Sequence, residues 1–369
     1  MPAHLARRER VRMALGHRQP DRVPFSWGFG PTREMTQCLR DWLRPQGIDF
    51  DRLRAATADT LRVDFPYIGP PQEPWTDIWG IRRQRQSYGT GEYNEIAHHP
   101  LAGVSRVDEI DAHPWPSPDW FDYDALSGMI QRAEAEFPGK AIVAGGGNPF
   151  EIYCWMTGLE EALLNLITQP EVVVRALERI TEFFLGRLER TARVLGDRVD
   201  LWFFADDLGG QNGLLMSRET YRDILQPFHR RLYAASKRVT PDSFALHHSD
   251  GSVFDLLPDL IDAGLDALEA VQTDCAKMSP EGLKAAYGDR LGFHGGISVQ
   301  QLLPRADAAT VARECRRLVE VFGRGGGYIA APSHAIQMGT PPENVMAMLR
   351  AVLGDADLSE AVSAAQTVA

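Results

Sequence analysis

The chain has 369 residues, of which 44% are hydrophobic and 24% are charged, and its formal net charge is −11 at pH 7. This length and composition are typical of a globular protein with a sizeable core. The acidic balance argues against a nucleic-acid-binding face, because neutralising phosphates requires a basic patch. No apolar run is long enough to cross a membrane. We therefore expect a small-molecule substrate, with neither a nucleic acid nor a membrane as partner.

The four cysteines, Cys38, Cys154, Cys275 and Cys315, lie far apart and show no C-x-x-C spacing. This pattern disfavours both a disulfide framework and a thiolate zinc finger. The N-terminus is charged and lacks the apolar segment of a signal peptide. Together these features predict a cytoplasmic protein.

In chain order, the first two strand candidates are residues 23–27 and 61–65. A long stretch rich in Pro and Trp follows over residues 66–120. Within it, residues 81–86 and 92–96 flank a turn that contains two glycines, which predicts a β-hairpin. We interpret residues 66–120 as an insertion that passes over the core of the fold and serves either as a lid or as a dimer contact.

Six further strand-sized apolar runs alternate with helical patterns over the rest of the chain. They are residues 141–145, 200–205, 243–248, 265–270, 291–293 and 328–331. Eight strands that alternate with helices predict a protein of the α/β class with a (β/α)8 TIM barrel. Residues 1–369 are expected to form this single domain, with the insertion between its second and third strands.

Active sites of such barrels lie at the C-terminal ends of the strands, and polar side chains follow most of the predicted strands. In strand order from the third to the eighth, these side chains are Asn148, Asp206 and Asp207, His248 and Asp250, Glu269 and Gln272, His294, and His334. Each of them alone is no more typical of a functional residue than of a structural one. Their common position at one rim favours a functional site.

His248 and Asp250 are two residues apart at a strand end, so their side chains are expected on the same face, where they can bind a metal or pass a proton. His247 is expected to face the helices and to be structural. One of Asp206 and Asp207 is expected to cap the following loop. The other is expected to have a functional role, because an unpaired buried carboxylate beside an aromatic strand is costly.

Several short motifs occur together in an order that resembles the uroporphyrinogen decarboxylase superfamily. They are RQPDRVP at residues 18–24, DDLG at 206–209, HSDG at 248–251, FHGGI at 293–297, GGGYI at 325–329, PSH at 332–334 and PPEN at 341–344. The resemblance implies a (β/α)8 barrel, which is commonly dimeric in the decarboxylases. It also implies one of two chemistries: cofactor-free decarboxylation of porphyrinogen acetate groups, or zinc-dependent methyl transfer that involves corrinoid proteins.

The two branches of this superfamily differ at positions that this sequence also contains. The decarboxylase pattern has an Arg-rich segment after the first strand, whereas residues 25–33 hold one arginine, Arg33. A highly anionic tetrapyrrole would need several cations there. The methyltransferase branch has His-x-Cys after the fifth strand and a Cys after the eighth. Here Asp250 stands at the first of these cysteines and His334 near the second, so that oxygen and nitrogen ligands replace thiolates.

We therefore predict a metal-dependent methyltransferase that moves a methyl group between a small substrate or thiol and a corrinoid carried by a partner protein. The resemblance implies Zn²⁺ held by His248, Asp250 and His334, with Glu269 as an exchangeable ligand. Asp206 or Asp207 would act in catalysis together with His248. The residues expected to bind and orient the substrate are Asn148, Gln211, Gln272 and His294.

Two alternatives remain open at this point. The first is uroporphyrinogen decarboxylation, in which Asp206 or Asp207 protonates a pyrrole-like substrate by general acid catalysis. The second is a non-catalytic ligand-binding protein that has kept the barrel. The polar rim argues against the second alternative, because an inactive site has no need of uncompensated histidines and carboxylates.

Overall fold

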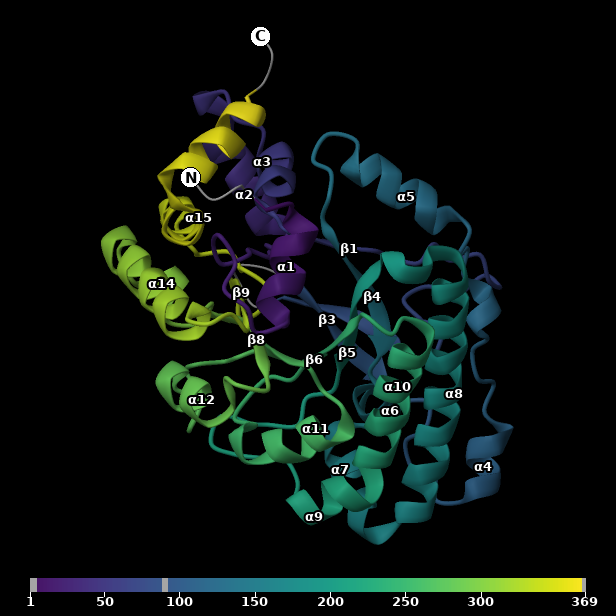
Figure 1. Cartoon of the computed structure of the whole chain (residues 1–369). Helices are drawn as coiled ribbons and strands as arrows, with labels where there is room; N and C mark the ends of the chain where they lie inside the picture. Colours follow the sequence, from purple (N-terminus) through teal and green to yellow (C-terminus); the bar gives the residue numbers. More distant parts are fainter. Residues whose placement is uncertain (1–4, 88–91, 367–369) are drawn as a thin grey trace.

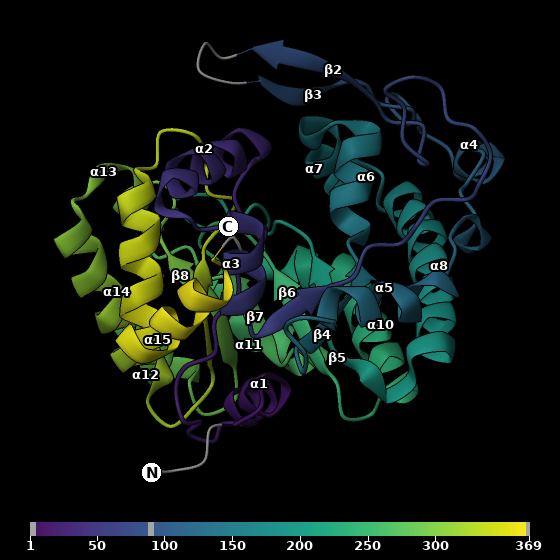
Figure 2. The same cartoon turned by 90° about the horizontal axis from the view of Figure 1, so that it is seen from above.

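The computed structural model describes residues 5–87 and 92–366, and Figures 1 and 2 show it from two directions. Its centre is a curled sheet of seven parallel strands in the order β1-β4-β5-β6-β7-β8-β9. These strands are β1 (Thr60–Arg62), β4 (Ala141–Gly147), β5 (Val199–Ala205), β6 (Phe244–His248), β7 (Ala267–Ala270), β8 (Gly292–Ile297) and β9 (Tyr328–Pro332). The chain therefore has the predicted α/β architecture.

Helices connect the strands and cover the outside of the sheet (Figure 1). The longer ones are α1 (Arg7–Leu15), α2 (Arg33–Leu43), α3 (Phe50–Thr57), α5 (Ala125–Glu134), α6 (Pro149–Thr157), α7 (Leu159–Thr168), α8 (Pro170–Leu195), α10 (Gln226–Val239), α12 (Pro280–Tyr287), α14 (Ala308–Gly323) and α15 (Pro342–Ala364). Short helices α4 (Val107–Ala112), α9 (Arg218–Thr220), α11 (Leu257–Ala263) and α13 (Leu302–Arg305) complete the connections.

The interior of the curled sheet has its own apolar core, separate from the core between strands and helices. Along β5, Leu201 and Phe203 face this interior, whereas Trp202 and Phe204 pack against the helices. This alternation follows from the two-residue period of a strand, and a strand covered on both faces is apolar throughout. Val11 of α1 also belongs to the interior core, so α1 closes the end of the sheet opposite to the hairpin of β2 (Arg82–Ser87) and β3 (Glu92–His98) (Figure 2).

The first predicted strand, residues 23–27, is not a strand in the structure. Phe25 forms an isolated parallel bridge with Ala330 of β9. Ala330 N–H donates to the Pro24 carbonyl (2.9 Å), and on the other side Asp59 N–H donates to the Phe25 carbonyl (2.8 Å). Because Pro24 has no N–H to donate, a regular ladder cannot continue through this segment. The segment nevertheless lies between β9 and the residues that lead into β1.

The insertion contains an antiparallel hairpin of β2 (Arg82–Ser87) and β3 (Glu92–His98). The turn expected at residues 88–91 lies outside the described residues. Figure 2 shows the hairpin at the same end of the molecule as α6 and α7. The guanidinium carbon of Arg83 lies 5.4 Å from the ring centre of Trp155 in α6, so the hairpin contacts the helix that follows β4.

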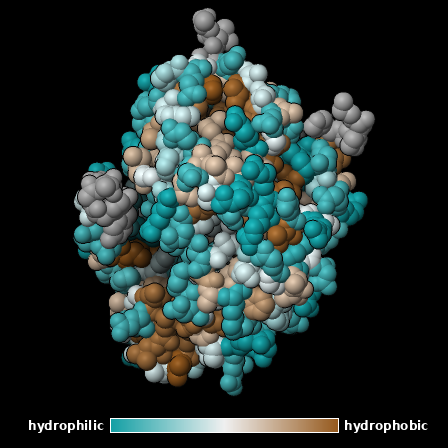
Figure 3. Space-filling model, turned by 90° about the vertical axis from the view of Figure 1, so that its left-hand side faces the viewer, coloured by the Kyte–Doolittle hydropathy of each residue, from teal (hydrophilic) through white to brown (hydrophobic). Residues whose placement is uncertain are grey.

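The surface is mainly hydrophilic on the face that Figure 3 shows, with a hydrophobic area at its lower left and smaller ones elsewhere, such as near the top. Large apolar side chains that are exposed include Leu159, Leu164 and Ile167 of α7. None of the described helices combines the length and the apolar character needed to cross a membrane.

Candidate metal centre

The register between β5 and β6 positions the residues at the centre of the candidate site. Ala205, the last residue of β5, pairs with His248, the last residue of β6. Beyond these ends the chains stay joined, because Asp206 N–H donates to the His248 carbonyl (3.1 Å) and Asp250 N–H donates to Asp207 Oδ1 (2.8 Å). The DDLG and HSDG motifs therefore form neighbouring turns at one rim.

Two glycines allow these turns to pack backbone against backbone. Gly251 has a φ of +84°, and a Cβ added there would lie 2.3 Å from the Gly209 carbonyl oxygen. Gln272 Oε1 accepts the Gly251 N–H (2.9 Å), and Gln211 Nε2 donates to the Asp274 carbonyl (3.1 Å). The structure thus places Gln211 and Gln272, which we expected to orient substrate, in contacts that hold loops together.

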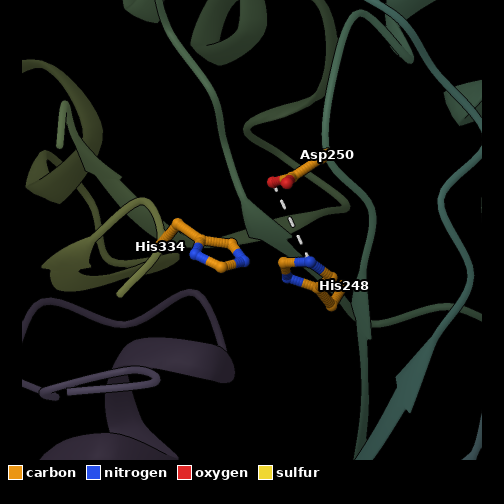
Figure 4. Close-up of side chains that lie close together, drawn as sticks. All are labelled: His248, Asp250 and His334. Atoms are coloured by element: carbon orange, nitrogen blue, oxygen red, sulfur yellow. Dashed lines mark ion pairs between the residues drawn. The ribbon is translucent and has the colours of Figure 1, made fainter. Parts of the chain in front are cut away.

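Three potential metal ligands meet beyond the strand ends, as Figure 4 shows. His248 ends β6, Asp250 follows it in the next turn, and His334 comes from the loop after β9. One ligand atom from each residue lies within 4.8 Å of the other two. His248 Nε2 is 3.8 Å from Asp250 Oδ1, and the ring of Phe29 packs against both imidazoles at centre distances of 5.0 and 4.9 Å.

The environment of these three residues fits a metal ion. Burial, with a smaller effect of nearby cations, lowers the pKa of His248 to about 3, so its imidazole is neutral, which is the form that binds metals. Its Nδ1 is buried with no hydrogen-bond partner among the described residues. Burial and the neighbouring Asp207 raise the pKa of Asp250 to about 6, which leaves it mostly ionised at pH 7. Two imidazoles and a carboxylate are a donor set that Zn²⁺ accepts.

The metal ligands border a pocket of about 370 Å³ at the strand ends, which we call the mouth pocket. It is lined by Phe29, Arg62, Gly145, Gly147, Asn148, Glu151, Trp155, Phe184, Arg187, Phe203, Ala205, Asp207, His248 and His334. Of the predicted site residues, the structure therefore brings Asn148, Asp207, His248 and His334 to one pocket. Asp250 lies directly beside it.

Asp206 and Asp207 have different environments. Asp206 is fully buried, and its carboxylate accepts the Glu151 N–H (2.6 Å) and lies 2.7 Å from His229 Nε2. Burial raises the pKa of Asp206 and lowers that of His229 to about 3, which favours a pair with no net charge. Asp206 therefore joins β5 to α6 and α10. These contacts differ from the capping of the following loop that we expected for one of the two aspartates. Asp207 is the carboxylate that faces the mouth pocket.

His247 lies in the same buried network as Asp206. Its Nδ1 is 2.7 Å from the Tyr233 hydroxyl and its Nε2 is 3.3 Å from the Asp206 carbonyl oxygen. These contacts place it between the sheet and α10, away from the mouth pocket.

Glu269 and His294 follow His248 across the sheet, because Glu269 pairs in register with His248. They are paired in register on β7 and β8, with Glu269 Oε1 3.7 Å from His294 Nδ1. Both line an inner pocket of about 600 Å³ that extends toward Arg54 of α3. Burial raises the pKa of Glu269 to about 8 and lowers that of His294 to about 4, so both are neutral at pH 7.

The expectation that Glu269 serves as an exchangeable ligand does not match its position. Glu269 lies outside the group of ligand atoms formed by the other three residues. On β7, Glu269 pairs in register with His248, whereas Asp250 and His334 lie beyond the ends of their strands.

The sequence interpretation missed three polar residues of the mouth pocket. Glu151, in the first turn of α6, accepts a hydrogen bond from Asn148 Nδ2 (2.8 Å), and burial raises its pKa to about 8. Arg62 ends β1, and its guanidinium carbon lies 4.1 Å from the ring centre of Phe203. A survey of strand ends would not have found Arg62, because β1 ends three residues before the end of the predicted strand of residues 61–65. Arg187 lies in the middle of α8, where no sequence signal separates it from surface arginines.

Replacing the two aspartates separately tests this division of roles. We expect Asp206→Ala to lower the free energy of unfolding by about 3 kcal/mol, because it leaves His229 Nε2 and the Glu151 N–H without a partner in the core. We expect Asp207→Ala to change it by less than about 1 kcal/mol, because this side chain is partly exposed. Urea denaturation measures both values, and equal losses would contradict the assignment.

Comparison with known proteins agrees with the motifs. The uroporphyrinogen decarboxylase (URO-D) family model matches residues 87–354. The chain is 22% identical over 266 residues to the uroporphyrinogen decarboxylase of Coxiella burnetii, which covers 70% of this chain and 69% of that enzyme. It is 23% identical over 261 residues to the uroporphyrinogen decarboxylase of Legionella pneumophila, which covers 69% of each.

Among solved structures, a methyltransferase from Methanosarcina mazei superposes with a TM-score of 0.69 at 18% identity, over 94% of this chain and 98% of that one. At this identity the superposition shows a shared fold. The family match extends over well more than half of the chain and includes β4 to β9 and the metal-ligand cluster. The chain therefore belongs to the uroporphyrinogen decarboxylase family, as its motifs predicted.

Proposed function

We propose that this protein is a metal-dependent methyltransferase of the uroporphyrinogen decarboxylase family. It moves a methyl group between a small substrate or thiol and a corrinoid carried by a partner protein. The observation that carries the proposal is the cluster of His248, Asp250 and His334, whose ligand atoms lie within 4.8 Å of one another. The fold shared with the methyltransferase from Methanosarcina mazei supports it.

We also propose that the curled sheet closes into the eight-membered barrel. The segment around Phe25 takes the place of the eighth strand, because it is hydrogen-bonded to Ala330 on one side and to Asp59, next to β1, on the other. Closure brings the loop after Trp27, which carries Phe29, over the same rim as the two histidines.

His248, Asp250 and His334 would hold Zn²⁺ and leave a further position for the substrate. Zinc in such a site supplies Lewis acid activation of a thiol or a leaving oxygen. The mouth pocket, at about 370 Å³, suits a small substrate. The aromatic rings of Phe29 and Phe203 lie beside His248 at centre distances of 5.0 and 6.1 Å.

Glu151 is placed to hold a proton inside the pocket. Burial raises its pKa to about 8, so the side chain is mainly protonated at pH 7. Asn148 fixes its orientation through the hydrogen bond to Oε2. We assign to Glu151 the transfer of this proton to the group that leaves when the methyl group is removed.

The proposed role of Glu151 predicts a pH profile. The acid loses its proton as the pH rises through its raised pKa, so the wild-type rate of methyl transfer from a methylated substrate to the corrinoid should fall above about pH 8. We expect Glu151→Gln to lower the rate by about 100-fold and to remove this alkaline limb, because the amide does not titrate. A glutamine variant that keeps the wild-type rate and profile would contradict the role.

The metal site predicts the following result for purified protein. The wild type should retain one equivalent of Zn²⁺ after dialysis, as measured by elemental analysis. His248→Ala should bind Zn²⁺ at least about 100-fold more weakly in calorimetry, because a ligand is lost. The matched control is His98→Ala, which removes an exposed histidine of β3 and should retain the metal.

The reaction itself is tested with two substrates. Methylcobalamin plus a thiol should be demethylated by the zinc-loaded protein, which the absorbance of the corrinoid reports, and His248→Ala should abolish this activity. Uroporphyrinogen is the second substrate, because the curated relatives are decarboxylases. Formation of coproporphyrinogen without methyl transfer would contradict our proposal and show that the protein is a decarboxylase.

A further inference from the structure

The mouth pocket contains a cation that the protein itself does not neutralise. Arg187 projects from the middle of α8 and lines this pocket. Its Nε is buried with no hydrogen-bond partner, and its guanidinium forms no ion pair with any residue in the part of the chain that the structure describes. Other arginines of α8 differ from it: Arg175 and Arg179 pair with Asp111, and Arg190 pairs with Asp119.

Aromatic rings hold the Arg187 guanidinium in place. Its central carbon lies 4.2 Å from the ring centre of Phe65 and 5.2 Å from that of Phe121. Gly145, at the end of β4, leaves room for it, because a Cβ there would lie 3.3 Å from Arg187 Nη2. Rings stabilise a guanidinium through its flat faces, whereas its N–H donors point outward in its plane. The rings therefore orient the group without satisfying all of its donors.

The electrostatic environment shows the cost of this arrangement. Burial lowers the pKa of Arg187 to about 10, and no carboxylate offsets this effect. The group is still charged at pH 7. Buried charges are normally paired, because an uncompensated one is costly. A cation that is held in a pocket and left unpaired is therefore suited to an anionic ligand.

A second arginine, Arg62, lines the same pocket, although it is exposed. Arg62 stacks on Phe203 and forms no ion pair within the described part of the chain. The carboxyl group of Glu151, which also lines the pocket, is mainly protonated at pH 7 and does not neutralise either cation. Asp207 is engaged with the Asp250 N–H.

We propose that the small substrate of the mouth pocket carries an oxyanion, and that Arg187, assisted by Arg62, binds it. A carboxylate fits best, because its two oxygens match the planar fork of donors of a guanidinium. The inference rests on the proposed function, since it names the chemical class of the substrate whose other end would reach His248, Asp250 and His334. Arg187 is thus a specificity-determining residue.

Two thiol probes of similar size, one anionic and one neutral, test whether the mouth pocket prefers an anionic ligand. Calorimetry of the full-length protein compares 3-mercaptopropionate with the neutral 3-mercaptopropan-1-ol, after a chelator has removed bound metal. The wild type should bind the acid about tenfold more tightly than the alcohol, because a charge-assisted hydrogen bond is lost with the alcohol. Arg187→Gln should abolish this preference, and Arg190→Gln, the matched control on the same helix, should keep it.

A lysine variant and three further anions complete the experiment. Arg187→Lys retains the charge without the planar fork and should keep part of the preference, and it replaces the Gln variant if that variant does not fold. Ethanesulfonate and inorganic phosphate against propionate distinguish a tetrahedral oxyanion from a carboxylate. Equal binding of acid and alcohol by the wild type, or a preference unchanged in Arg187→Gln, would overturn the inference.

The proposed function fails separately from this inference. Adding Zn²⁺ should tighten the binding of the neutral thiol, 3-mercaptopropan-1-ol, in the wild type and in Arg187→Gln alike. If Zn²⁺ has no effect while the wild type still prefers the acid, the result contradicts the metal site of the proposed function and supports the anion site. If Zn²⁺ tightens binding but the wild type shows no preference for the acid, the result contradicts the anion site and supports the metal site.

Discussion

The site depends on the register between β5 and β6. Because Ala205 lies opposite His248, the two following turns leave the sheet at the same level and remain hydrogen-bonded to each other. A shift of one residue in β6 would turn His248 toward α10 and His247 toward the pocket, since the side-chain period of a strand is two. The buried contacts of Asp206 and His247 with α10 and its neighbours oppose such a shift.

Burial then sets the charges around the mouth pocket. It favours the neutral forms of His248 and Glu151, because a charged group loses its hydration when water is excluded. Arginine remains charged under the same conditions, since its intrinsic pKa is much higher. The pocket therefore combines a neutral metal-binding imidazole and a carboxylic acid with two cations that lack partners among the described residues. This combination suits a small anionic substrate that is activated by a metal and receives a proton.

Much of the fold could be predicted from the sequence, since apolar runs such as residues 200–205 correspond to buried strands. The segment of residues 23–27 has the same apolar pattern, but Pro24 interrupts its ladder. In the site, the spacing of His248 and Asp250 placed them together, because both lie at one strand end. Sequence alone could not separate Asp206 from Asp207, since their roles depend on His229 in a distant helix. The position of Arg187 in the mouth pocket could not be predicted from the sequence either, because it depends on how α8 packs against the sheet.

Zinc-edge X-ray absorption of the metal-loaded protein tests the central claim most directly. The account predicts a first shell of nitrogen and oxygen at about 2.0–2.2 Å with imidazole scattering from two histidines, and no sulfur. His248→Ala should remove one of the imidazoles from this shell. A sulfur contribution at about 2.3 Å, or a spectrum that His248→Ala leaves unchanged, would contradict the account, because the metal would then be bound elsewhere in the protein.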